Sequence, residues 1–176
     1  VYSGEVMLYN LTKHGNRKVI FILGKGQLLN QSIVSKKPNA LFCEAVCPVK
    51  VIEIAEEQFL QLMEQSHALT RAVLREYERN LWRMGHQLKN TTGNMQMERK
   101  IATKLWKLGR DFGVDTEDGV MIDIDLTITL MADLVGAPRE NVSRACKVLT
   151  DRGLIRYGNK RFILTDSDGL AEFYKM

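Results

Sequence analysis

Residues 136–155 read GAPRENVSRACKVLTDRGLI, and this stretch carries two patterns on one predicted helix. The apolar residues recur at the three-and-four spacing of a helix that buries one face: Val142, Ala145, Val148 and Leu149. The other face gathers the polar residues of the first turns: Arg139, Glu140, Asn141, Ser143 and Arg144. Packing explains the apolar face, but it leaves the polar face without a purpose.

The residues around this helix predict a small unit of helices followed by a hairpin. A helix is predicted over 97–112 and a strand-like run over 120–124. Thr127 can cap a short helix that stops at Gly136, and Pro138 suits the start of the next one. Residues 154–164, with a turn at Gly158-Asn159, predict a two-stranded hairpin. This order of elements is that of a winged helix-turn-helix.

The winged helix-turn-helix order gives the polar face a purpose. In this motif the second helix places its N-terminal residues against base edges in the major groove. Arginine can donate two hydrogen bonds to guanine, and glutamate can accept one from cytosine. We therefore predict base contacts by Arg139, Glu140, Ser143 and Arg144. The predicted phosphate contacts are Thr127, Thr129, Asn141, Lys147, Lys160 and Arg161. The alternative for Glu140 and Arg144, one turn apart, is an ion pair within the helix.

The first 54 residues have the pattern of short strands separated by glycine-containing corners. Residues 4–9 and 18–23 flank a turn at 13–16, which predicts a hairpin. Residues 42–54 supply two further β-like pieces, interrupted at Pro48. Such strands favour a sandwich or barrel, and a short helix is predicted after them over 56–64.

A long helix is predicted from about residue 68 to the low nineties. Apolar residues recur in it with the seven-residue period of a coiled coil: Leu74, Tyr77, Leu81, Met84 and Leu88. We interpret this row as a dimer seam, the alternative being a helix packed on its own domain. Residues 91–94 break the helix and predict a hinge near Gly93-Asn94. The predicted domains are therefore 1–66, 67–94 and 95–176.

Composition narrows the class of protein. Of the 176 residues, 45% are apolar and 26% charged, as in soluble globular proteins, and the longest apolar runs are too short to cross a bilayer. The net charge of +4 is compatible with a nucleic-acid partner. Three cysteines in two regions, without a leader pattern at the start, predict a reducing cytoplasm. No phosphate loop and no nucleophile with a base are recognisable, so no enzyme activity is predicted.

Over nearly its whole length the chain resembles the Crp/Fnr family of bacterial transcription regulators. The residues that carry the resemblance are Leu134-Val-Gly-Ala-Pro-Arg-Glu-Asn-Val-Ser-Arg, Leu149, Gly153-Leu-Ile, Gly4-Glu-Val, Gly15 and Gly26. The resemblance implies an α+β fold with a jelly-roll-like sensory β-roll, a long dimerisation helix and a C-terminal winged helix-turn-helix. It also implies a homodimer on a palindromic operator in double-stranded DNA, with RNA polymerase as a further partner. Family members carry further elements before the position of Val1.

The same resemblance suggests what the second helix reads. Glu140 and Arg144 fall on the family's base-reading pair, which implies a TGA core with Arg144 on guanine and Glu140 on the opposite cytosine. Arg139 matches an additional arginine of the cyclic-AMP receptor type, whereas Ser143 matches a serine of the Fnr type. The base on the 5′ side of the core therefore stays open. Thr127 falls where the family contacts a phosphate.

The effector is less well indicated by the sequence. Cyclic-AMP binders of the family hold the phosphate with a Gly-Glu pair and an Arg-Ser pair, which correspond here to Asn30-Gln31 and about Asn39-Ala40. The missing arginine argues against cyclic AMP. The resemblance then implies an unidentified small-molecule effector between β-roll and long helix. Cys43 and Cys47 are candidates for a thiol redox switch, with packing as small core residues as the alternative.

Other cofactors are weaker alternatives. An iron-sulfur cluster of the Fnr type needs four cysteines, of which these residues do not supply a full set, and no metal site is predicted. The sequence thus predicts a sequence-specific DNA-binding regulator controlled by an effector or redox signal other than cyclic AMP. The alternative function is a cyclic-nucleotide-type ligand-binding or coiled-coil interaction module that reads no DNA sequence.

Overall fold

The computed structural model describes residues 1–13, 15–30, 32–35, 37–91 and 95–175, with the side chains of 89–91 outside this description. The chain divides into two compact units, residues 1–10 with 20–93 and residues 11–19 with 94–176. The predicted hinge at Gly93-Asn94 and the effector-related position Gln31 lie outside the described residues. Each unit mixes strands and helices, which confirms the predicted α+β class.

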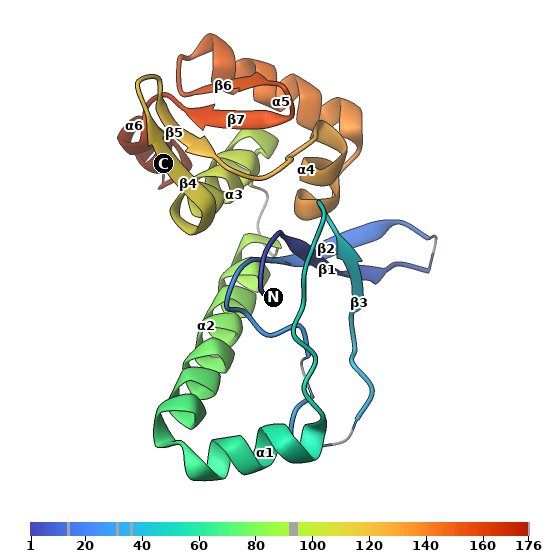
Figure 1. Ribbon diagram of the computed structural model, residues 1–176. Coiled ribbons are helices and arrows are strands. Elements are labelled where there is room, and N and C mark those ends of the chain that lie inside the picture. Colours follow the sequence, from blue (N-terminus) through green and yellow to red (C-terminus); the bar gives the residue numbers. More distant parts are fainter. Residues whose placement is uncertain (14, 31, 36, 92–94, 176) are drawn as a thin grey trace. The chain divides into compact units, whose positions relative to one another are not determined.

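The first strands form a small sheet in the order β2-β1-β3 (Figure 1), from β1 (Val6–Leu11), β2 (Arg17–Leu23) and β3 (Phe42–Ala45). β1 and β3 are antiparallel. Leu8, Phe21 and Leu23 are buried together on one face of this sheet, because alternate residues of a strand point to the same side. The predicted hairpin is thus confirmed.

The β-like piece predicted after Pro48 does not form a strand. Lys50 makes one isolated bridge with Ser3, and the described residues 51–55 that follow carry no strand. Val51 and Ile52 are exposed there. Their β-branched side chains fit a strand, but a strand needs a neighbour to accept its hydrogen bonds, and this segment has none in the described residues. The prediction of a second strand was wrong.

The long helix buries two charged residues beside Val73 and exposes an apolar row. α1 (Glu56–Gln65) leads into α2 (His67–Thr91), within about one residue of the predicted start. Glu76 and Arg83 are buried, with 8% and 7% of their surface exposed, whereas Leu74, Leu81 and Leu88 are exposed. A surface helix normally shows the opposite arrangement.

The described residues of the second unit form a four-stranded sheet in the order β4-β5-β7-β6 (Figure 1), together with four helices. Its elements in chain order are α3 (Met97–Phe112), β4 (Gly113–Thr116), β5 (Gly119–Ile122), α4 (Ile128–Val135), α5 (Arg139–Asp151), β6 (Ile155–Gly158), β7 (Arg161–Leu164) and α6 (Ser167–Lys175). The predicted winged helix-turn-helix order is confirmed, and the wing is the β6–β7 hairpin. β4 and α6 were not predicted.

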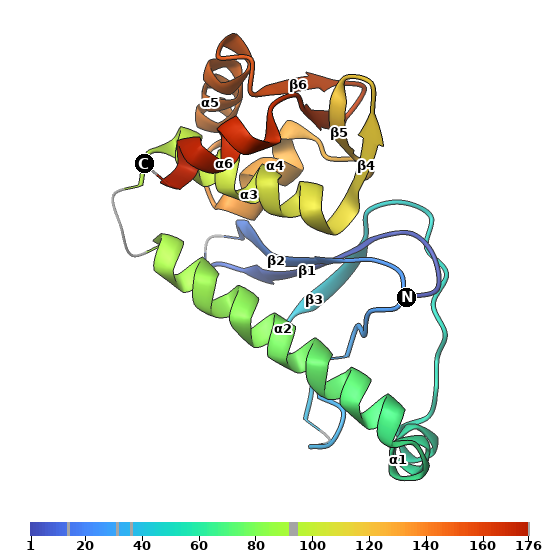
Figure 2. The same cartoon turned by 90° about the vertical axis from the view of Figure 1, so that its left-hand side faces the viewer.

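Helix α3 is the centre of this unit. Its residues Ile101 and Leu105 are fully buried, as the sequence predicted, and they share the core with Leu149 of α5 and Phe162 of β7. α6 packs against α3, where both views place it (Figure 2), and buries Leu170. α3 thus packs against α4, α5 and α6 and also against the strands β4, β5 and β7.

The ends of α4 follow the predicted signals. The Thr127 hydroxyl oxygen accepts the Leu130 N–H at 3.0 Å, and Gly136 closes the helix in a left-handed conformation with φ 69°. The wing turn is shifted by one residue from the prediction. Asn159 and Lys160 both have positive φ, so they form the centre of the turn, and Gly158 ends β6.

Replacing Gly153 with alanine should lower the free energy of unfolding by about 1 kcal/mol, because φ at Gly153 is 72° and an alanine is strained there. Gly153 ends α5: its N–H donates to Thr150, and the next N–H donates from Leu154 to Leu149. The control is Gly158→Ala, since neither glycine has a neighbouring atom within 4 Å of an added Cβ and Gly158 lacks the positive φ. Denaturant unfolding of both variants measures the difference, and equal curves would contradict the prediction.

Candidate DNA-binding site

The polar face of α5 is presented to solvent as the sequence predicted. Arg139, Glu140, Ser143 and Arg144 are exposed. The opposite face is buried through Val142, Ala145 and Leu149, which anchor the helix in the core. Since the helix cannot rotate without exposing these three residues, its outward face is held in one orientation.

Arg144 is oriented by a neighbour on its own helix. Its Nη2 donates a hydrogen bond to the Asn141 side-chain oxygen at 2.6 Å. Within the described part of the chain, no ion pair joins Arg144 to Glu140, so the alternative that the sequence allowed for these two residues is not formed. Asn141, predicted to contact a phosphate, also positions the arginine. The Glu140 carboxylate remains exposed, available to a donor from outside.

The predicted phosphate contacts lie at the start of α4, on α5 and in the wing turn. Thr129, Lys147 and Lys160 are exposed, whereas Thr127 is half-buried because its hydroxyl caps α4. The Leu126 N–H donates to the Lys160 carbonyl oxygen at 2.8 Å. This bond joins the wing turn to the residue before the α4 cap.

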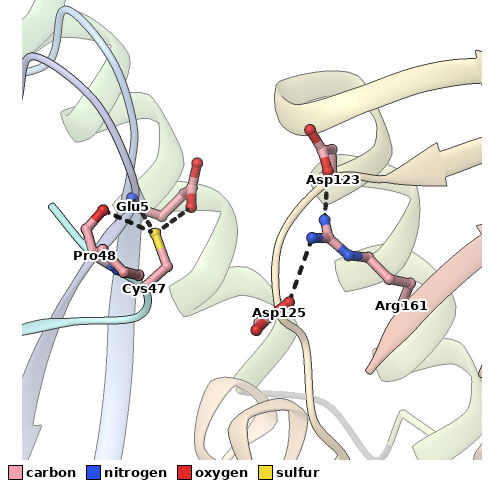
Figure 3. A network of polar contacts seen from close by, with 6 residues as sticks. All are labelled: Glu5, Cys47, Pro48, Asp123, Asp125 and Arg161. Carbon is pink, nitrogen blue, oxygen red and sulfur yellow. Dashed lines mark hydrogen bonds and ion pairs between the residues drawn. The ribbon is translucent and has the colours of Figure 1, made fainter. Parts of the chain in front are cut away.

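Arg161, also predicted to contact a phosphate, has two carboxylate partners in the structure (Figure 3). Its Nη1 donates to Asp123 Oδ1, and its Nη2 lies 3.4 Å from Asp125 Oδ1. These two partners of Arg161 were not predicted from the sequence. The available signal was the alternation of Asp123 and Asp125 around buried Ile124, which turns both carboxylates to the same side.

The thiol of α5 is separate from the polar face. Cys146 is buried, and burial raises its pKa to about 11. The thiol is therefore protonated at neutral pH and behaves as a small apolar group. Its place in α5 is explained by packing.

Cys43 and Cys47 are held apart by the sheet. Cys43 pairs with Leu8, and Cys47 accepts the Glu5 N–H and donates to its carboxylate at 3.0 Å (Figure 3). Leu8 lies three positions after Glu5, about 10 Å along an extended chain, so the two cysteines face different parts of this segment. Cys43 is exposed, contrary to the alternative that both cysteines pack in the core, and partial burial raises its pKa. A redox role for either thiol stays a prediction.

Two family models match this chain. A Crp-like helix-turn-helix domain matches residues 99–173, and a cyclic nucleotide-binding domain matches residues 1–66. The chain belongs to the Crp/Fnr family. The resemblance seen in the sequence is therefore confirmed, together with the β-roll and winged helix-turn-helix fold that it implied.

Curated relatives of this Crp/Fnr protein are similar over most of its length. The CRP-like cAMP-activated global transcriptional regulator of Mycobacterium tuberculosis is 24% identical over 172 residues, which cover 97% of this chain and 76% of the relative. The global nitrogen regulator of a Nostoc species is 24% identical over 162 residues, covering 90% and 72%. Both are named as regulators, and this chain is likewise a transcription regulator with a helix-turn-helix DNA-binding domain, not an enzyme.

Solved structures share the fold. A CRP/FNR-family transcriptional regulator from Thermus thermophilus superposes with a TM-score of 0.78 at 20% identity, covering 100% of this chain and 86% of the other. FixK2 from Bradyrhizobium japonicum superposes with a TM-score of 0.77 at 19% identity, covering 98% and 84%. In the part of the Crp/Fnr chain that the structure describes, no helix has the length and apolar character needed to cross a membrane.

Proposed function

We propose that this regulator reads a palindromic operator as a homodimer, through half-sites with a TGA core. The observation that carries the proposal is the exposed face of α5, where Arg144 is held by Asn141 and the Glu140 carboxylate stays open. Arg144 would bind guanine O6 and N7, and Glu140 would accept from the amino group of the paired cytosine. Arg139 and Ser143 would contact the base beside this core.

Phosphate contacts would supply most of the affinity and make it dependent on salt. The candidates are Thr127, Thr129, Asn141, Lys147 and Lys160; Arg161, the sixth residue predicted from the sequence, faces Asp123 and Asp125 instead. The backbone bond from Leu126 to Lys160 supports this assignment, because it places the wing turn and the start of α4 next to each other. Contacts of this kind set the register of the protein on the duplex, and α5 then reads the bases.

The dimer would form along α2. Leu74, Leu81 and Leu88 are exposed at seven-residue intervals, and Met84 is exposed between them. Tyr77, the remaining seam residue, is half-buried; burial raises its pKa, and a hydrogen bond with the backbone of Ile33 acts in the opposite direction. A two-fold axis along this seam would set the two α5 helices into successive major grooves about 34 Å apart.

A small polar effector would bind against the inward face of α2. Burying charged groups is costly unless they are paired. Glu76 accepts from Gln27 at 3.1 Å and pairs with Arg79 at 3.0 Å, whereas the buried Asn80 Oδ1 has no hydrogen-bond partner in the described residues. The open acceptor on this face is therefore Asn80 Oδ1, which a donor group of a ligand could satisfy. The proposed effector is a small molecule other than cyclic AMP.

In this proposal residues 1–66 sense the effector, 67–94 form the dimer helix and hinge, and 95–176 bind DNA in the cytoplasm, next to RNA polymerase. The effector would shift the population of two arrangements of the hinge. We would measure operator affinity for three preparations of the protein: as purified, after reduction, and after unfolding and refolding to release bound small molecules. A difference between them would support control by an effector or by redox state. Equal affinity in all three states would indicate a constitutive regulator.

Selection from a random DNA pool tests the reading function. The full chain, oxidised and reduced, should enrich an inverted repeat with a TGA core and about ten base pairs between half-site centres. A difference between the two preparations would implicate Cys43 or Cys47. Retention of all sequences alike, and only at low salt, would instead favour the interaction module that reads no DNA sequence.

A further inference from the structure

The wing and the start of α4 are joined by a second link besides the backbone bond at Leu126. Arg161 opens β7, directly after the wing turn, and its guanidinium joins the carboxylates of Asp123 and Asp125 (Figure 3). These two aspartates lie between β5 and the cap residue Thr127. The two terminal nitrogens of the guanidinium therefore both bind to residues 123–125, which lead into α4.

The sheet register explains why these side chains meet. β5 and β7 are antiparallel with Val120 opposite Leu164 and Met121 opposite Ile163. Continued by two residues, this register sets Asp123 opposite Arg161. Ile124 and Leu126 are buried on the inner side of the segment, so Asp123 and Asp125 must point outward. The ion pairs thus follow from strand pairing and from the burial of two apolar residues.

The same geometry disfavours a direct phosphate contact by Arg161. Both terminal nitrogens of the guanidinium already face a carboxylate oxygen. One positive group between two negative ones leaves a local net charge of −1, which repels a phosphate. Lys160, the preceding residue, is exposed and forms no ion pair with a carboxylate of the described residues.

We propose that Arg161 is a positioning residue for DNA binding, which holds the wing turn at a fixed distance from the start of α4. This inference rests on the proposed function, because the groups so spaced are Lys160 and Thr127, both assigned to phosphates. The ion pairs are partly exposed and contribute little to folding stability. The ion pairs instead fix the position of the wing turn. Without them, the backbone hydrogen bond from Leu126 to Lys160 is the remaining link between the wing turn and residues 123–126.

A matched control exists on the neighbouring strand. Arg156 of β6 makes a bidentate ion pair with a single carboxylate, that of Asp118 in the turn between β4 and β5, at 2.9 and 3.3 Å. Arg156→Gln and Arg161→Gln each remove one positive charge from the same sheet, together with the ion pair to Asp118 in the first case and those to Asp123 and Asp125 in the second. Only Arg161 is linked to the segment before α4.

The experiment measures operator affinity of the full chain and amide exchange of Leu126 without DNA. Arg161→Gln should weaken operator binding about ten-fold and speed the exchange of the Leu126 amide, whereas Arg156→Gln should stay within about two-fold of wild type. Arg161→Glu with Asp123→Arg keeps the local charge and rebuilds the pair, so it should restore the affinity to within about three-fold.

The outcomes separate this inference from the proposed function. Arg161→Gln could lose affinity while the Leu126 amide exchanges at the wild-type rate and the Arg161→Glu, Asp123→Arg double variant restores nothing. This result would show a direct phosphate contact and overturn the positioning role. Wild-type affinity of Arg161→Gln would overturn it as well, although the regulator still reads its operator. Wild-type protein that selects no operator would refute the proposed function, and this inference with it.

Discussion

Arg144→Ala should weaken operator binding by about 1–3 kcal/mol, roughly 5-fold to 150-fold, and remove the preference for guanine at one position of the half-site. Arg144 is exposed and its Nη2 is already held by Asn141, so the free protein presents the side chain in an ordered position. An ordered donor loses less conformational freedom on binding. Titration at fixed salt, with four operators that differ only in the base at that position, measures both the loss of affinity and the loss of the preference for guanine.

The matched control for Arg144 is Arg152, at the other end of α5. Arg152 lies at the C-cap and its guanidinium stacks over the Phe173 ring at 5.0 Å. Arg152→Ala removes the same charge from the same helix and should leave base preference unchanged. If Arg144→Ala weakened operator and random DNA by equal factors, Arg144 would be a phosphate contact, and the base-reading role would have to pass to Arg139.

The helices could be predicted from the sequence where local signals agreed with burial. α3 was predicted at its observed bounds because Ile101, Leu105 and Leu108 repeat at helical spacing. β4 was missed because its four residues are all exposed, so no apolar alternation marks a strand whose stability comes from pairing with β5. α6 was missed because Asp166 and Gly169 are typical of a loop, although Asp166 accepts the Gly169 N–H at its start.

The candidate site shows the same division between local and tertiary information. Residue types and helix period sufficed to choose the outward face of α5. They could not decide that Arg144 turns to Asn141 instead of Glu140, since both lie within reach on the same helix. The partners of Arg161 depend on the pairing of β5 with β7, which joins residues 38 positions apart. Such pairings are set by the sheet register, and the sequence carries only weak traces of it.

The two faces of α2 differ in burial and in polarity. Its inward face buries Glu76 and Arg83, and its outward face exposes a leucine row along 25 residues, about 37 Å. Exposed leucines at a seven-residue period have no advantage in an isolated chain and are the pattern of a coiled coil. The helix therefore has a surface suited to a second copy on one side and polar groups suited to a ligand on the other.

Leu81→Lys should convert the dimer to a monomer and reduce operator affinity at least about a hundred-fold, because two half-sites are then bound independently. Leu81 is central in the row and 74% exposed in the single chain. The change removes two leucines from each interface, about 2 kcal/mol for each leucine, and sets two ammonium groups against each other. Light scattering gives the mass, and titration with the selected operator gives the affinity.

Ala72→Lys is the matched control, since it adds the same exposed lysine to α2 away from the leucine row. It should keep the dimeric mass and the operator affinity. Both variants should unfold as cooperatively as the wild type at concentrations where all are monomeric, because neither site is buried in the single chain. Dimeric mass in Leu81→Lys would place the interface elsewhere. A monomer that kept full operator affinity would mean that the two α5 helices do not need to be joined through α2.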